Sequence, residues 1–399
     1  MSDDSQAWGF SKSIIVFLVV CILAGLTVLI GMTGGDQMQT ATNASQITDA
    51  FQPSSNPGPS NALGSASDAT IWRQIRSGQI NGQASTSGFM IQTQGTSWLN
   101  LRNNILPRFG GWLLLGTIAA VSLFFVLRGR IRIASGRSGT WVPRMSAIER
   151  LSHWIMAISF IVLALTGLNM LYGRALVLPL IDGALFASVL SWGKFIHNYI
   201  AFAFMFTLAL NFLLWIKDNF PTWTDVKWLL KGGGMIGSGH PPAGRFNAGE
   251  KGVFWIVMLG GLLISLTGIE MLWPYSYKLF EITGPYLNPI LAGISSGFVW
   301  LNTSLGTSFF PTDITLTTQW TPMAEQQTAQ IWHAVIGFGL MAVVIGHIYI
   351  ATVGMEGALE GMTKGKVDAN WAKEHHSLWA EKMARKGKIP SESEGQPAE

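Results

Sequence analysis

Residues 331–350 read IWHAVIGFGLMAVVIGHIYI, an apolar stretch that nevertheless carries two histidines, His333 and His347. A polar side chain in the core of a bilayer is costly and usually functional. The two histidines are fourteen positions apart. That is nearly four turns of an α-helix, so they share one face and stand ~21 Å apart along its axis. The spacing predicts two polar sites at different depths of a membrane.

The composition of the whole chain is that of a membrane protein. Of its 399 residues 49% are hydrophobic and only 12% are charged, about half the charged share of a soluble domain. The net charge of +4 is small, and no basic patch interleaved with aromatic residues indicates a nucleic-acid partner. A membrane-spanning helix needs about 20 apolar residues. Six segments meet or approach this length: 13–33, 110–127, 148–172, 194–216, 252–273 and 330–353.

These segments predict an all-α membrane protein. We expect a four-helix bundle over 148–353, one or two extra N-terminal transmembrane helices, a small exterior region, and a long loop over 274–329. The first segment is expected to be a retained helix because it is long and no A-x-A site follows it; a cleaved signal peptide is the alternative. The predicted regions are 1–33 (helix or signal peptide), 34–107 (exterior, with a few short strands in 71–101), 108–147 (second helix and basic linker), 148–353 (core) and 354–399 (charged tail).

Basic residues set the expected orientation, because cytoplasmic loops are enriched in Lys and Arg. They cluster after the second, fourth and sixth segments, whereas the alternate connections 173–193 and 274–329 hold only Arg174 and Lys278. This pattern predicts a bacterial inner membrane protein with both termini in the cytoplasm, if the first span is retained. Residues 34–107 are expected to be periplasmic whether the first segment is a retained helix or a signal peptide.

Four histidines fall in or at the ends of the core segments. The alternation of the spans places His197 and His333 toward the outer side, and His153 and His347 toward the inner side. Two imidazoles from facing helices are the axial ligand set of a haem. We interpret His240, His375 and His376, in a loop and in the tail, as solvated surface residues.

The single cysteine, Cys21, excludes CxxCH haem attachment and cysteine-ligated iron–sulfur clusters within this chain. The pattern therefore favours two non-covalent b-type haems over packing histidines or another transition-metal site. Four glycines near the histidines would leave room for a porphyrin, although small residues also serve helix packing. These glycines are Gly167, Gly337, Gly339 and Gly346.

An internal repeat supports the ligand pattern. The segment IERLSHWIMAISFIVLALTGLNML resembles GEKGVFWIVMLGGLLISLTGIEML at an offset of 101 positions, with His153 facing Phe254. KFIHNYI aligns with QIWHAVI at an offset of 136, which pairs His197 with His333 and Asn211 with His347. The chain is therefore interpreted as two related helical hairpins; chance similarity between apolar helices is the alternative.

Polar groups near the histidines suggest secondary roles. Arg150 and Lys194 each lie three positions before a candidate ligand and are candidates to pair with a haem propionate. Asn247 and Gly249, in RFNAGEK before the fifth span, supply polar groups at the depth of the inner pair. They are candidates for a quinone head group, and an ordinary helix-entry turn is the alternative.

Five motifs in order resemble the cytochrome b (gamma) subunit of respiratory formate dehydrogenase over about 148–380: IERLSHW, GKFIHN, RFNAGEKGVFW, IWHAVIGFGLMAVVIGHIY and GMTKGKVDANWAKEHHSLW. The resemblance implies a di-haem core. It makes His197 and His333 the ligands of the periplasmic-side haem, and His153 and His347 those of the cytoplasmic-side haem. Asn247, Gly249 and His347 then fall where the family binds quinone.

The resemblance also implies the partners. A molybdenum or tungsten catalytic (alpha) subunit oxidises formate outside, an iron–sulfur (beta) subunit relays the electrons, and this chain passes them to quinone without acting on formate itself. We expect the exterior parts to dock the partner subunits. Three alternatives stay open: a di-haem cytochrome b for a hydrogenase or another periplasmic oxidoreductase, a haem-free membrane anchor, and a superoxide-to-quinone oxidoreductase.

Overall fold

A computed structural model describes residues 95–234, 241–273, 276–308, 310, 312, 316 and 320–389. The chain divides into two compact units, one of Met1–Gly34 with Leu101–Glu399 and the other of Gly35–Asn100. The first predicted span and most of the exterior region lie outside the described residues. Where the end of the exterior region is described it is helical, α4 (Gly95–Asn100), so short strands are wrong for that part.

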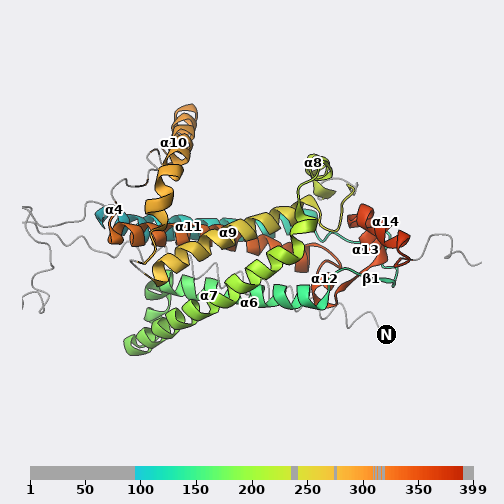
Figure 1. Cartoon of the computed structure of the whole chain (residues 1–399), viewed down its shortest axis with the longest axis horizontal. Helices are drawn as coiled ribbons and strands as arrows, with labels where there is room; N and C mark the ends of the chain where they lie inside the picture. Colours follow the sequence, from blue (N-terminus) through green and yellow to red (C-terminus); the bar gives the residue numbers. More distant parts are fainter. Residues whose placement is uncertain are drawn as a thin grey trace, which may run out of the picture. The chain divides into compact units, whose positions relative to one another are not determined.

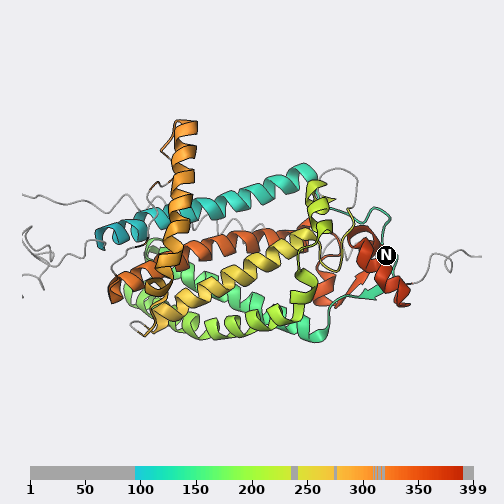
Figure 2. The ribbon, with the colours of Figure 1, turned by 45° about the horizontal axis from the view of Figure 1, so that its top comes forward.

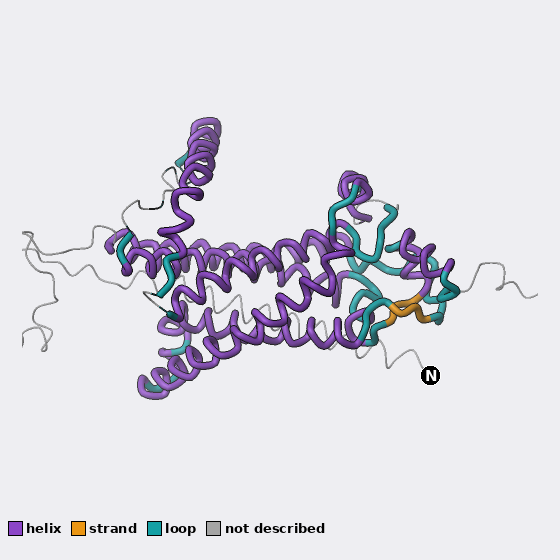
Figure 3. Tube along the Cα trace, viewed as in Figure 1, coloured by secondary structure: helices purple, strands orange, loops and turns teal. Residues whose placement is uncertain are grey.

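Five long helices confirm the all-α membrane class. They are long and apolar enough to cross a membrane, and each corresponds to one of the five described segments predicted as spans. Figures 1 and 3 show them running along a common axis. The helices are α5 (Leu106–Arg128), α6 (Ala147–Leu176), α7 (Gly183–Asn219), α9 (Ala248–Leu272) and α11 (Pro322–Tyr349).

The long helices alternate in direction, which defines two ends of the bundle. At the first, here named the α10 end, α5, α7 and α11 begin and α6 and α9 finish; the opposite end is named the tail end (Figure 1). The hairpin of α6 and α7 packs against the pair of α9 and α11, mainly through α7 and α9. Polar caps start the helices at the tail end: Ser146 and Glu149 form a capping box on α6, and Asn247 and Glu250 form one on α9.

The extra helix α5 lies along α11, on the outside of the four-helix core (Figure 2). Gly110 allows this close approach, because a Cβ there would lie 2.3 Å from the Phe338 ring. The Tyr172 hydroxyl donates to the Pro107 carbonyl at 2.7 Å and ties α5 to the end of α6. Further along, Phe124 and Phe125 make edge contacts with Tyr349.

The prediction of a loop over 274–329 is wrong, because residues Leu279–Leu305 form a 27-residue helix, α10. Pro285, Pro289 and several glycines concealed it. The buried Glu325 carboxylate accepts from the backbone nitrogens of Phe280 and Glu281, which satisfies the first turn. Figures 1 and 2 both show α10 turning steeply away from the direction of the bundle.

The charged tail is folded rather than solvated. Strand β1 (Trp141–Pro143) of the basic linker pairs antiparallel with β2 (Lys366–Asp368), and Val142, Val367 and Trp371 form the centre of a small core. The interpretation of His375 and His376 as surface residues is therefore wrong: they are 9% and 1% exposed. The remaining short elements are η3 (Leu101–Ile105), η4 (Leu178–Leu180), α8 (Trp223–Leu230), η5 (Gly232–Gly234), η6 (Ile350–Gly354), α12 (Glu360–Thr363), α13 (Ala369–His375) and α14 (Ser377–Arg385).

Candidate functional site

The structure gathers the four candidate ligand histidines into two pairs inside the bundle. The ring centres of His197 on α7 and His333 on α11 are 6.2 Å apart. Those of His153 on α6 and His347 on α11 are 6.3 Å apart. An imidazole nitrogen binds a metal at about 2 Å, so two imidazoles that share one ion have ring centres roughly 6 Å apart. Both pairs meet this spacing.

The pair nearer the α10 end, His197 and His333, is held by two threonines. Thr166 Oγ1 lies 2.8 Å from His197 Nδ1, and Thr267 Oγ1 lies 3.0 Å from His333 Nδ1. Each hydroxyl also donates to a carbonyl of the preceding helical turn, at 2.7 Å from Thr166 and 3.0 Å from Thr267. The only hydroxyl proton is used there, so the threonine oxygen accepts from Nδ1–H. The Nε2 atoms are left as the basic nitrogens.

Two glycines next to these threonines lie against the histidine rings. A Cβ on Gly167 would lie 3.6 Å from His197 Cε1, and a Cβ on Gly268 would lie 3.5 Å from His333 Cε1. A methyl group at either position would make an ordinary van der Waals contact with the ring. Gly339 and Gly346 of α11 have open space within 4 Å of a built Cβ, whereas a Cβ on Gly337 would contact Ile264 at 3.5 Å.

The pair nearer the tail end, His153 and His347, lacks this support. His153 Nδ1 is buried and has no hydrogen-bond partner among the described residues. Its ring makes an edge contact with Trp154 and lies 6.2 Å from the Trp215 ring. A buried polar atom without a partner is unusual, and it marks a place where a bound group or water would complete the site.

The residues at the start of α9 have a structural role as well as a candidate ligand role. Asn247 Oδ1 accepts from Glu250 N at 2.9 Å, and Asn247 N donates to Glu250 Oε2 at 2.9 Å. The side-chain amide Nδ2 of Asn247 is the group left for a ligand. Gly249 is exposed, and a Cβ there would lie 3.3 Å from both Asn247 Oδ1 and the Trp228 ring.

Two crossed ion pairs lock the tail end and follow the internal repeat. Arg144 Nη2 lies 2.9 Å from Glu250, and Arg245 Nη2 lies 2.7 Å from Glu149. Each guanidinium also donates to the other arginine's carbonyl at 2.8 Å. The glutamate of each capping box is thus paired with the arginine that precedes the other hairpin. Trp215 adds an indole N–H bond of 2.9 Å to Glu149.

The buried His376 joins the tail to this lock. Its Nδ1 donates to Gly244 O at 2.8 Å, and its Nε2 lies 3.3 Å from Arg144 Nη2 and 3.7 Å from Glu250 Oε2. Burial, followed by the nearby Arg144 charge, lowers the pKa of His376 from 6.5 to about 4. The ring is therefore neutral at physiological pH, and it connects the tail to Gly244 and Arg144 through its two nitrogens.

The two candidate propionate partners lie in different settings. Arg150 Nη1 donates to Thr363 O at 2.7 Å, so part of its guanidinium already holds the chain before β2. Lys194 is exposed on α7, near the depth of the His197 pair. Of these two candidates, only Lys194 is an exposed surface cation.

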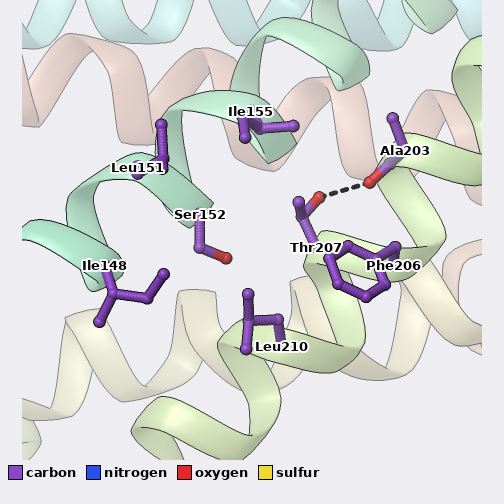
Figure 4. A pocket seen from close by; sticks show the side chains of 8 residues that line it. All are labelled: Ile148, Leu151, Ser152, Ile155, Ala203, Phe206, Thr207 and Leu210. Carbon is purple, nitrogen blue, oxygen red and sulfur yellow. Dashed lines mark hydrogen bonds between the residues drawn. The ribbon is translucent and has the colours of Figure 1, made fainter.

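A groove of about 210 Å³ opens between α6 and α7 (Figure 4). Six of its eight lining side chains are apolar. Ser152 Oγ is buried there without a partner among the described residues, whereas Thr207 Oγ1 donates to Ala203 O at 2.7 Å. None of the four candidate ligand histidines lines this groove, so it is separate from the two histidine pairs.

The donor set fits a macrocycle-bound iron better than a free ion. Within the described ranges, no group of three or more His, Cys, Asp or Glu side chains is placed to hold a metal. Each site offers two facing imidazoles and an apolar surround, which leaves the remaining iron ligands to come from a porphyrin. The residues present therefore fit two haems.

Comparison with known sequences decides the family. The family model described as prokaryotic cytochrome b561 matches residues 144–365. The chain belongs to the prokaryotic cytochrome b561 family. The match begins at Arg144 and covers both histidine pairs, both capping boxes and α10.

Several relatives of this chain are named as subunits of formate dehydrogenases. The chain is 25% identical over 256 residues to the formate dehydrogenase, nitrate-inducible, cytochrome b556(Fdn) subunit of Escherichia coli K12, covering 63% of this chain and 96% of that protein. It is 23% identical to the cytochrome b556(fdo) subunit of the same strain, covering 60% and 91%. It is 26% identical to the formate dehydrogenase cytochrome b556 subunit of Haemophilus influenzae, covering 60% and 82%. The resemblance expected from the motifs is confirmed.

Membership of the cytochrome b561 family implies that the chain is a multi-pass bacterial membrane protein that binds b-type haem. The helices that precede Arg144, including α5, lie outside the matched region.

Sequence reasoning named the four histidines but did not assign roles to Thr166, Thr267, Arg144 or Arg245. The repeat contained the missing signal, because both threonines and both arginines are related by the same offset of 101 positions.

Proposed function

We propose that this chain is the membrane cytochrome b subunit of a formate dehydrogenase complex. It receives electrons from an iron–sulfur subunit on the periplasmic side and delivers them to quinone near the cytoplasmic side. The observation that carries the proposal is the convergence of four histidines from three helices into two pairs, stacked along one bundle. Their separation of ~21 Å along α11 covers much of a bilayer core of about 30 Å.

The proposed ligands are His197 with His333 and His153 with His347. Two b-type haems bound there supply carriers that take up and release one electron at a time. The chain's own contribution is to present neutral imidazoles from facing helices, to exclude water from the bundle, and to keep the two sites at fixed depths. The two threonines hold the rings of the first pair with Nε2 turned away from the hydrogen bond.

The direction of transfer follows from the distribution of charge. Most basic residues of the described chain lie at the tail end, including Arg144, Arg245 and the lysines of 364–388. By the positive-inside rule this end faces the cytoplasm. The quinone site is proposed at the start of α9, where the Asn247 amide donates to a quinone oxygen, the exposed Gly249 offers its backbone, and His347 lies on the neighbouring helix.

The partners are proposed from the relatives, which are named as subunits of formate dehydrogenases. An iron–sulfur subunit and a molybdenum or tungsten catalytic subunit would supply electrons from formate at the α10 end. Alignment over 96% of the Escherichia coli subunit supports this assignment, because nearly the whole length of that subunit has a counterpart in this chain.

Haem quantitation on the purified chain tests the cytochrome function. We expect about two b-type haems per chain by the pyridine haemochrome method. His333→Ala and His347→Ala are each expected to lose or alter the ligation of a different haem, whereas the control His375→Ala keeps both. A folded preparation without haem, or a single haem lost in both variants, would contradict the two-site arrangement.

Reduction of the haems in native membranes tests the complex. Formate is expected to reduce both haems, and a quinone-site inhibitor is expected to leave them reduced. Reduction by hydrogen but not by formate would replace the proposed partner with a hydrogenase and would leave the electron path through this chain intact.

A further inference from the structure

The hydrogen bonds around the two histidine pairs differ, and the difference follows the internal repeat. Thr166 and Thr267 occupy equivalent positions in the two hairpins, 101 residues apart, and each contacts the histidine of its own partner helix. A hydroxyl that donates to its own helix can only accept from the ring. Two independent hairpins therefore arrive at the same ring tautomer.

We propose that Thr166 and Thr267 are positioning residues that set the electronic character of the haem site nearer the α10 end and make it inequivalent to the inner site. An acceptor on Nδ1–H fixes the ring and increases the basicity of the ligating nitrogen. A more basic ligand favours the ferric form, so the pair lowers the midpoint potential of that site. His153 Nδ1 has no such acceptor among the described residues.

The lower midpoint potential expected at the site nearer the α10 end agrees with the proposed electron path, on which this inference rests. The site with the threonines lies on the side where electrons enter, and the site without them lies next to the proposed quinone position. Two added acceptors lower the potential of the first site relative to the second, so transfer from the first to the second is favoured. The chain thus builds a gradient from otherwise similar ligand sets.

Thr207 provides a matched control. It lies in α7, is 3% exposed, and donates to Ala203 O at 2.7 Å, as Thr166 donates to Val162 O. Its hydroxyl contacts no histidine in the described structure. Replacing it with valine removes the same group from a similar helical environment without touching a ligand.

The test is a redox titration with low-temperature EPR on the haem-loaded chain carrying Thr166→Val, Thr267→Val or Thr207→Val. Loss of a group that hydrogen-bonds to a metal ligand typically changes metal affinity or activity by about tenfold or more. A tenfold change in the equilibrium constant between the oxidised and reduced forms corresponds to 59 mV for one electron. We expect a positive shift of roughly this size, with altered g values, at one haem only. Thr166→Ser and Thr267→Ser restore the original signals, and Thr207→Val changes neither haem.

The outcomes separate this inference from the proposed function. Two bound haems with signals in Thr166→Val and Thr267→Val that match Thr207→Val would overturn the positioning role alone. A shift that serine fails to restore would also overturn it, because a purely steric effect would remain. Absence of haem from the unmodified chain would overturn the proposed function first.

A second inference rests on α10, independently of the histidines. From Ile282 to Leu305 this helix has no charged residue. Ile282, Tyr286, Ile290 and Ile294 recur every four positions and are 68%, 77%, 60% and 43% exposed. The roughly opposite face is covered: Phe280 stacks on Trp320, and the Asn302 side chain holds the backbone of Phe310. Within the part of the chain that the structure describes, one face of α10 is therefore apolar and has no packing partner.

We infer that this face lies on the membrane surface at the α10 end. The helix turns steeply away from the bundle axis at the depth where α9 finishes (Figures 1 and 2), so it runs along the bilayer plane rather than across it. It is not among the five described helices that qualify as spans. Tyr286 and Trp300 are residues typical of the membrane interface, and about 36 Å of uncharged helix with an exposed apolar face is not expected to remain in water.

Spin-label accessibility in liposomes tests this placement. Single cysteines at Ile290, Ile294 or the control Thr303 are introduced into the full-length Cys21→Ser chain and labelled with a nitroxide. Ile290 and Ile294 are expected to collide severalfold more with oxygen than with a water-soluble nickel chelate, relative to Thr303. Equal access to the chelate at all three positions would place α10 in water. Protection from both reagents would assign the face to a protein partner, and either result overturns the inference.

Discussion

Acidification is expected to loosen the tail through His376. In the folded chain this ring is 1% exposed, and three neighbours face it: Arg144 at 3.3 Å, Glu250 at 3.7 Å, and the adjacent His375. Burial and Arg144 lower the pKa of His376 from 6.5 to about 4, although Glu250 acts in the opposite direction. A proton that binds the undocked tail more tightly than the docked tail must destabilise docking.

The sign and size of the effect follow from this shift. Docking is fully stabilised above pH 6.5, and the contribution is lost as the pH falls from 6.5 toward 4. At pH 5 the undocked state gains about 2 kcal/mol, a roughly thirtyfold rise in its population. Asp368, which caps α13, does not share this window. Burial raises the pKa of its carboxyl, but hydrogen bonds donated by Ser138, Asn370 and Gly139 outweigh burial and lower the pKa below 3.8.

Hydrogen exchange of residues 366–389 at pH 7.5 and pH 5, corrected for intrinsic rates, measures the opening. His376→Asn is the matched variant, because its amide keeps a donor for Gly244 O but does not titrate. We expect the wild-type tail to open with acid and the variant to respond far less. The reasoning is refuted if both proteins show the same pH response, or if the wild-type tail exchanges equally at the two pH values.

Two further changes test the packing. Gly110→Val is expected to weaken the contact of α5 with α11 by about 1–3 kcal/mol, since its side chain would enter the Phe338 ring; thermal melting should show the loss, and Phe338→Leu should restore part of it. Arg144→Met is expected to destabilise the tail end by about 1.5–3 kcal/mol, because the partly exposed Glu250 loses its ion-pair partner but keeps the hydrogen bond from Asn247 N. Adding Glu250→Gln to Arg144→Met should cost less than the sum of the single changes in denaturation, and full additivity would argue against the ion pair.

The sequence was sufficient for the core of the fold because periodic apolar segments are its strongest signal. The four core spans and α5 were predicted within a few residues at the tail end, where capping residues such as Ser146 and Asn247 mark the starts. Their α10-end boundaries were less accurate. Helix α7 begins at Gly183, eleven residues before the predicted start, because its first three turns extend beyond the apolar stretch.

The elements that were missed depend on contacts between distant residues. Helix α10 contains two prolines, and its first turn is completed by Glu325, 45 residues beyond Phe280. The tail reads as a solvated charged segment, yet β2 pairs with β1 more than 220 positions earlier in the chain. His376 is buried only because the linker and the start of α9 close over it. No local pattern carries such information.

The internal repeat explains which residues of the candidate site could be predicted from the sequence. It preserves what both hairpins need for folding: an arginine, a capping pair with its glutamate, and the threonine that holds a ring. It differs at Phe254, which stands where the first hairpin has His153, and at Asn211, which stands where the second has His347. Asn211 is fully buried and donates to the Met156 sulfur, and Phe254 is packed in the core.

The inner pair thus combines one histidine from each hairpin at non-equivalent positions. That asymmetry leaves its nitrogens without the threonine partners of the outer pair, and it places the less constrained site beside the proposed quinone position.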